Sequence, residues 1–170
     1  MSVAKHLRYK PGMVYAVPLV DGTFGLAQAG EAMLPNVIYV ALYLDRYPDV
    51  PAGVPSMQRE NIVSLVATWK KNLNKGAWLP LGIATQAAAR HEFPNEAVAD
   101  QGYVAAKHYD AGILAEFLSA FHGLLPWNVM FDPAYYDRLL APGAARSDKI
   151  RMLNETDRVA YRREVFGTDA

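Results

Sequence analysis

The chain has 170 residues, of which 52% are hydrophobic and 20% charged, a composition typical of a globular protein and not of a disordered one. Its 17 basic and 17 acidic residues leave no formal net charge, so the strongly basic face of a nucleic-acid-binding protein is not expected. It has no cysteine, which excludes disulfides, thiolate nucleophiles and cysteine-ligated zinc sites.

No targeting or membrane segment is expected. The first twelve residues, MSVAKHLRYKPG, carry charges and no apolar stretch, unlike a secretory signal. No apolar run reaches the roughly 20 residues that a membrane helix needs. No linker is long enough to separate domains. We therefore predict one cytoplasmic domain over residues 1–170, β-rich at about 11–84 and helical at about 110–166, with no cofactor.

Residues 13–29 predict a β-hairpin that turns at Asp21-Gly22, because glycine accepts the positive φ that a tight turn requires. Pro18 selects the register of the hairpin. A two-residue turn would place Pro18 at a hydrogen-bonded position, where proline has no N–H to donate. A three-residue loop places Pro18 opposite Phe24 at a non-bonded position, and we expect this register.

Three further strands are expected, at residues 37–44, 62–68 and 77–84. The first is rich in β-branched and aromatic residues, as in a buried strand. The last contains Pro80, which favours the edge of a sheet. Residues 45–61 are rich in proline and are expected to form a loop. We predict an α+β fold whose N-terminal half is a small SH3-like bent sheet or barrel, with C-terminal helices packed on it.

The stretch over residues 85–109 is ambiguous in sequence. QAAARHEF is compatible with a short helix that ends at Pro94. GYVAAKHYD is compatible with a further strand. Both alternatives stay open at this point.

Three helices are expected after residue 109. Their capping residues are predicted to be Asp110, Asp132 and Asn154. The first helix ends at Gly123, and its apolar face of about two turns must pack on the sheet. The second runs through Leu140. The third runs to Phe166, and its few apolar residues predict weak packing or a frayed end.

The sequence carries no recognisable catalytic signature. It contains no GxSxG, P-loop, GxGxxG or HExxH motif, and no two histidines have the spacing of a helical zinc pair. His91 or His108 could act with a carboxylate in a site assembled from loops, and a small enzyme of this kind is one alternative. The preferred interpretation is that both histidines are ordinary polar residues, so no catalytic, cofactor or metal residue is predicted.

Several residues are candidates for contact with a protein partner. Trp127 and Tyr135 could be exposed aromatic anchors, since tryptophan and tyrosine dominate interface hot spots. The preferred interpretation of Trp127 is a buried residue that locks the helix connection to the sheet, with its indole N–H on a nearby carbonyl. Glu92, Glu96 and Asp100 could form a local acidic patch.

One more candidate is a polar, basic turn in the stretch KKNLNKG. Its members are Lys70, Lys71, Asn72, Asn74 and Lys75. Contact with a partner is one interpretation, and a solvated hairpin tip is the preferred one.

Two segments resemble a known family. Residues 11–29, PGMVYAVPLVDGTFGLAQA, have a Pro-Gly, an apolar strand into Pro-Leu, an Asp-Gly turn and an aromatic-Gly strand. Residues 120–140, AFHGLLPWNVMFDPAYYDRLL, have a Gly-Leu-x-Pro-Trp stretch followed by Asp-Pro-x-Tyr and Leu-Leu. Together they resemble the opening and closing parts of the immunity protein 26 family of bacterial polymorphic toxin systems. The middle matches in outline only, and the tail from Ala144 lies outside the match.

The resemblance implies a β-rich fold and the neutralisation of a toxin made by the same cell or its kin. It supplies no catalytic residues. We therefore expect an immunity protein that binds a cognate protein toxin and occludes it, with no direct nucleic-acid or membrane partner. A self-associating structural or adaptor domain, such as a homodimer, is the other alternative, because a chain without net charge associates more easily.

Overall fold

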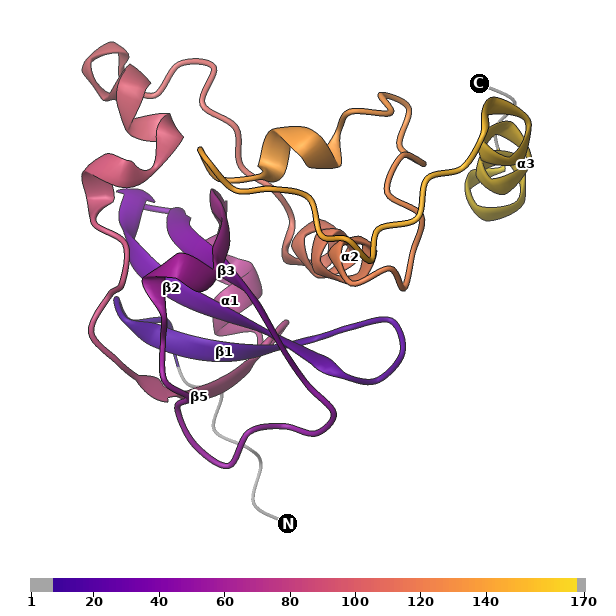
Figure 1. The fold of residues 1–170 in the computed structure, drawn as a ribbon. Helices are drawn as coiled ribbons and strands as arrows, with labels where there is room; N and C mark the ends of the chain where they lie inside the picture. The colour runs from indigo at the N-terminus through magenta and orange to yellow at the C-terminus, as the bar shows by residue number, and fades with distance from the viewer. Residues whose placement is uncertain (1–7, 168–170) are drawn as a thin grey trace.

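The computed structural model describes residues 8–167, and an antiparallel sheet occupies its N-terminal half (Figure 1). The strands are β1 (Met13–Pro18), β2 (Phe24–Leu34), β3 (Val37–Tyr47), β4 (Ile62–Trp69) and β5 (Leu79–Ile83). Their order is β4-β3-β2-β1-β5, so β5 returns to pair with β1 and lies at an edge, where Pro80 was expected. No ladder joins β4 to β5 within residues 8–167, so the sheet is open and does not close into a barrel. The α+β class is confirmed.

The hairpin has the predicted register. Pro18 pairs with Phe24 across β1 and β2. The loop between them is closed by the N–H of Leu19, which donates to the carbonyl of Thr23 at 2.8 Å. Gly22 has a φ of +85°, which is the left-handed conformation expected for this turn.

Both faces of the sheet are covered. In β3, seven successive residues from Val37 to Tyr43 are buried. Ile38, Val40 and Leu42 belong to the core that includes α2 (Ala111–Phe121). Tyr39 and Tyr43 face the other side, where the chain between about residues 84 and 106 covers the sheet. This continuous burial explains why the strand reads as an unbroken apolar run.

The first and third predicted helices are present with their predicted caps. The carboxylate of Asp110 accepts from the N–H of Gly112 at 2.8 Å and begins α2. Asn154 accepts from the N–H of Asp157 at 2.8 Å and begins α3 (Glu155–Phe166). None of the helices within residues 8–167 is long and apolar enough to cross a membrane.

The helix α3 lies at the far end of the molecule from the sheet (Figure 1) and is attached through a buried arginine. The Arg158 guanidinium donates to the carbonyls of Asn128 at 2.6 Å, Met130 at 2.6 Å and Phe131 at 2.8 Å. The Asn128 amide in turn donates to the Leu153 carbonyl at 2.8 Å. Polar contacts, and not an apolar face, therefore hold this helix, which accounts for its low apolar content.

Two predictions for the first half were wrong. The stretch 45–61 is not all loop, because β3 continues through Tyr47 and η1 (Arg59–Asn61) precedes β4. The stretch 70–76 is not a hairpin tip, because β4 and β5 are not partners. It forms the short helix α1 (Lys70–Asn74), and burial of Leu73 in the core stabilises that turn of helix.

The ambiguous stretch forms 3₁₀ helices, η2 (Arg90–Glu92) and η3 (Pro94–Gln101). No strand follows them. Tyr103 and Ala105 both have positive φ values, 61° and 68°, which no strand can accommodate. Within residues 85–109, only Tyr109 forms an isolated β-bridge, and its partner is Thr68 of β4.

The second predicted helix is shorter than expected. Asp132 does accept from the N–H of Ala134 at 2.9 Å, as a cap would. The regular part is a single 3₁₀ turn, η4 (Tyr136–Leu139). Packing explains why this segment forms a 3₁₀ turn. Tyr136 and Leu139 are both buried and are three residues apart, and a 3₁₀ turn places residues with this spacing on the same side.

Candidate functional site

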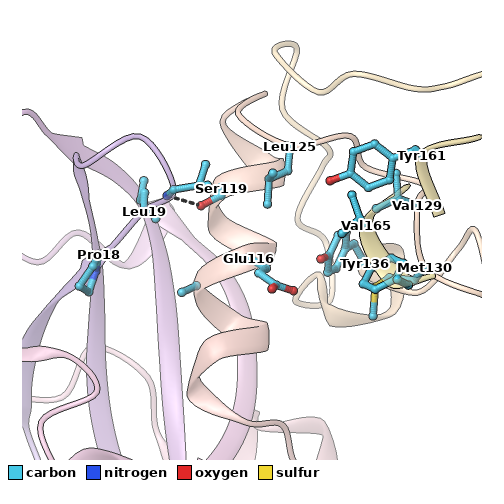
Figure 2. A pocket seen from close by; sticks show the side chains of 13 residues that line it. Pro18, Leu19, Glu116, Ser119, Leu125, Val129, Met130, Tyr136, Tyr161 and Val165 are labelled. Atoms are coloured by element: carbon cyan, nitrogen blue, oxygen red, sulfur yellow. Dashed lines mark hydrogen bonds between the residues drawn. The ribbon is translucent and has the colours of Figure 1, made fainter. Parts of the chain in front are cut away.

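A groove of about 350 Å³ opens between the β1–β2 turn, α2 and α3 (Figure 2). Residues 18–20 of the turn form one wall, and one face of α2 lies beside them. Residues 125–130 and the last two turns of α3 complete the opposite side. Segments from four parts of the chain therefore meet at this groove.

The wall formed by residues 18–20, which we call the near wall, is fixed to α2. The N–H of Val20 donates to the hydroxyl of Ser119 at 3.2 Å (Figure 2), and Ser119 is itself buried. Below this contact α2 lies close to β2, because a Cβ built on Gly25 would stand 2.9 Å from a methyl of Leu118. The absence of a side chain at Gly25 allows this approach and sets the distance between turn and helix.

Behind the groove an aromatic cluster joins α2 to the following connection. The ring of Trp127 lies 5.5 Å from those of both Phe117 and Tyr136. Trp127 is fully buried, and its indole N–H donates to Asp137 at 3.0 Å. Arg146 donates two bonds to the same carboxylate, at 2.6 and 2.7 Å, and holds the pKa of Asp137 below its usual value. Trp127 thus locks the connection and offers no exposed surface.

Besides Ser119, which accepts from the N–H of Val20, three polar side chains without a hydrogen-bond partner in the described part of the chain line the otherwise apolar groove. Glu116 of α2 forms no hydrogen bond or ion pair with any residue that the structure describes, and partial burial raises the pKa of its carboxyl. Across the groove stand Tyr136 and Tyr161 (Figure 2), whose hydroxyls also have no hydrogen-bond partner among residues 8–167. Burial and the charge of Glu116 raise the pKa of Tyr136. No lysine, arginine or histidine lines this groove.

Apolar side chains surround the opening. Val20 on the turn is 62% exposed, and Val165 and Phe166 at the end of α3 are 53% and 50% exposed. Phe131, beside the groove residue Met130, is 76% exposed, and the Arg162 guanidinium lies 5.2 Å from its ring. Three of these side chains line the groove and form what we call the apolar rim: Val20, Val165 and Phe166.

The predicted acidic patch is largely committed to internal contacts. Glu92 forms an ion pair with Arg59. Glu96 accepts from the hydroxyls of Tyr39 at 2.6 Å and Tyr103 at 2.7 Å, and from Arg90 at 2.8 Å. Burial acts to raise the pKa of Glu96, but these bonds hold it below its usual value.

Asp100, the third member, is exposed in η3. The segment that carries all three carboxylates covers the face of the sheet opposite to α2. The structure therefore does not bring them to the groove.

Neither candidate histidine lines the groove. His91 is exposed in η2. His108 is exposed, with its ring edge-on to Trp69 at 4.2 Å, beside a hollow of about 370 Å³ that Tyr135 and Arg138 help to line. No carboxylate lines this hollow. Tyr135, the second aromatic candidate, is half-buried there.

A histidine that the sequence did not single out is buried. His122 follows α2, and its Nε2 atom has no hydrogen-bond partner within the described chain. Burial and the nearby cations Arg46 and Lys149 lower the pKa of His122 to about 4, so the imidazole is neutral at pH 7. No cluster of three or more histidine and acidic side chains suited to a metal ion occurs among residues 8–167.

The basic turn forms part of another hollow, beside Trp69. The ammonium of Lys71 lies 5.6 Å from the Trp69 ring centre, and Lys70 also lines the hollow. The two asparagines of the turn bond to residues far away in the sequence. Asn72 donates to Asp110 at 3.2 Å, and Asn74 accepts from the N–H of Tyr9 at 2.7 Å. Lys75, at the end of the turn, is exposed.

Comparison with protein-family models, with curated proteins and with solved structures finds no match to this chain. The resemblance to the immunity protein 26 family therefore stays a prediction. The groove was not predicted from sequence, because its walls come from distant segments. One signal was present: Glu116 is the only charged residue in the helix AGILAEFLSAF.

Proposed function

We propose that this chain is an immunity protein that binds a protein toxin in the cytoplasm and occludes it, and that the groove with its apolar rim is the binding surface. The observation that carries the proposal is the groove itself, which is open and largely apolar and is lined by three exposed apolar side chains. Contiguous exposed apolar surface of this kind marks interaction sites in soluble proteins.

Burial of the rim would supply binding energy. A fully buried Val or Phe side chain contributes about 1.5–3 kcal/mol relative to an exposed one. The rim contains two valines and one phenylalanine, and aromatic residues are enriched at the centres of interfaces. The near wall is also held in place before binding, by the bond between Val20 and Ser119. A preorganised surface loses less entropy on association.

Both segments that carry the family resemblance contribute to this surface. Residues 11–29 include the turn that forms the near wall. Residues 120–140 supply Leu125, Val129 and Met130, together with Tyr136. A shared binding surface is one physical reason for two distant segments to keep such a pattern.

The proposal is tested by co-expression with the product of the neighbouring gene, because immunity genes lie beside their toxin genes. We expect the wild-type chain to restore growth and to co-purify with that product. Val165→Glu places a charge on the rim and should abolish both effects. The matched control is Val104→Glu, since Val104 is 69% exposed but lies in the segment that covers the other face of the sheet. It should protect like the wild type.

Unchanged toxicity and no co-purified complex with the wild-type chain would refute the proposal. Light scattering of the isolated chain gives a second outcome. A dimer that dissociates in Val165→Glu and not in Val104→Glu would assign the rim to self-association.

A further inference from the structure

The Glu116 carboxylate has no cation beside it, although it lines the groove from the exposed surface of α2. It forms no ion pair or hydrogen bond within residues 8–167, and no basic side chain lines the groove. Its charge acts on Tyr135 and Tyr136, whose pKa values are raised by burial first and by Glu116 second. A carboxylate in such a setting is stabilised by any cation that enters.

The other two polar groups of the groove without a partner among residues 8–167 are tyrosine hydroxyls, which stand near this charge and can accept hydrogen bonds. The hydroxyls of Tyr136 and Tyr161 have no partner in the described chain, and Figure 2 shows both side chains across the groove from Glu116. Tyr136 is only 2% exposed. An ionised carboxylate accepts hydrogen bonds and donates none, and a tyrosine hydroxyl can also accept. The three groups together suit a ligand with several donors.

The size and lining of the groove restrict the ligand further. Its volume of about 350 Å³ lies at the lower end of the range for ligand pockets, roughly 300–1,000 Å³. Leu125, Val129 and Val165 make its walls apolar. A long side chain with an aliphatic stem and a charged head matches this combination, because the stem packs on apolar surface while the head reaches the polar groups.

We infer that the groove receives a basic side chain of the partner, arginine in preference to lysine, with its head between Glu116 and the hydroxyls of Tyr136 and Tyr161. Arginine is preferred because the guanidinium is planar, presents five N–H donors and is less strongly hydrated than an ammonium. The apolar rim then packs on the residues beside the arginine. The inference rests on the proposed function, because it assigns the groove to a segment of a protein partner.

The test uses two capped peptides, Ac-Phe-Arg-Phe-NH₂ and the same peptide with citrulline, which keeps the shape of arginine without its charge. Each is titrated to millimolar concentration into the isotopically labelled full chain while amide shifts are followed by NMR. We expect the arginine peptide to shift residues of the turn, α2 and the end of α3, and to bind about tenfold more tightly than the citrulline peptide.

Glu116→Gln should remove the tenfold preference without changing the fold, because Glu116 is exposed at the surface of α2. The matched control, Asp100→Asn, removes an exposed carboxylate from η3 and should keep the preference. Equal binding of the two peptides, no shifts in the groove, or a preference that survives Glu116→Gln would each overturn the inference. These readouts need no toxin, so their failure is separate from failure of the co-expression test.

Discussion

We expect the buried His122 to make the protein less stable in mild acid. Burial and the cations Arg46 and Lys149 lower its pKa to about 4, against 6.5 for a histidine in an unfolded chain. As the pH falls below about 6.5, the unfolded chain binds a proton that the folded protein does not accept until about pH 4. The stability due to neutral His122 is therefore complete above pH 6.5 and is lost between pH 6.5 and 4.

The expected loss of folding stability follows from the size of the shift in the pKa of His122. One pKa unit corresponds to about 1.4 kcal/mol, so a shift of this size corresponds to roughly 3 kcal/mol over the whole window. About 2 kcal/mol of this should be lost by pH 5. The carboxyls of Asp21, Glu96 and Asp137, whose pKa values are lowered, lose their contribution mainly at lower pH.

The assay is urea unfolding of the wild type and of His122→Gln at several values between about pH 7.5 and 5. The free-energy difference between the two proteins isolates His122, because every other titrating group is common to both. We expect this difference to shift against the wild type by about 2 kcal/mol across the range. The control is His108→Gln, which removes an exposed imidazole and should retain the acid loss. Stability curves that run parallel for wild type and His122→Gln would refute the reasoning.

Three further substitutions, the last of them with a matched control, test other parts of the fold. Trp127→Phe removes the indole donor to Asp137 and part of the core, and should lower the free energy of unfolding in urea by about 2 kcal/mol; an unchanged midpoint would contradict the locking role. Arg158→Met leaves three carbonyls without their donor, and hydrogen exchange should show faster exchange in α3 with the sheet still protected; uniform exchange rates would contradict a polar attachment. Gly22→Ala should lower the free energy of unfolding by about 1 kcal/mol, because its φ is +85°. Gly53→Ala, whose Cβ would meet nothing within 4 Å, should not destabilise, and equal losses in both glycine variants would contradict the turn geometry.

Short-range signals predicted most of the regular elements. The Asp-Gly turn and the missing N–H of Pro18 were enough to place Pro18 opposite Phe24, because both act within a few residues. The caps Asp110 and Asn154 were predicted for the same reason. Each of these features depends on local hydrogen bonds, which sequence spacing describes well.

Elements that depend on tertiary packing were missed. The stretch 70–76 has turn-like composition, yet burial of Leu73 makes part of it helical. The predicted strand before residue 109 fails because Tyr103 and Ala105 adopt positive φ, and their sequence gives no sign of it. Tyr103 is held there by contacts with Arg90 and Glu96, which lie several residues earlier.

The candidate site was less predictable than the fold. The sequence allowed Trp127 either an exposed role in binding a partner or a buried role in holding the helix connection to the sheet. Only its depth of burial distinguishes these two roles. Glu92 and Glu96 looked like a free acidic patch because their cations, Arg59 and Arg90, are brought to them by folding. Glu116 was passed over because a single carboxylate forms no motif.

The position of β1 has a consequence for the order in which the chain assembles. β1 lies between β2 and β5. Val14 pairs with Gln28 of β2, which follows closely in the sequence, whereas Met13 pairs with Ile83 of β5, which is far along the chain. During synthesis, at about 5–20 residues per second, the hairpin and the β2–β4 meander can form while one edge of β1 still lacks its partner. Although β1 is synthesised before the other strands of this sheet, it is therefore the last of them to have both of its neighbours.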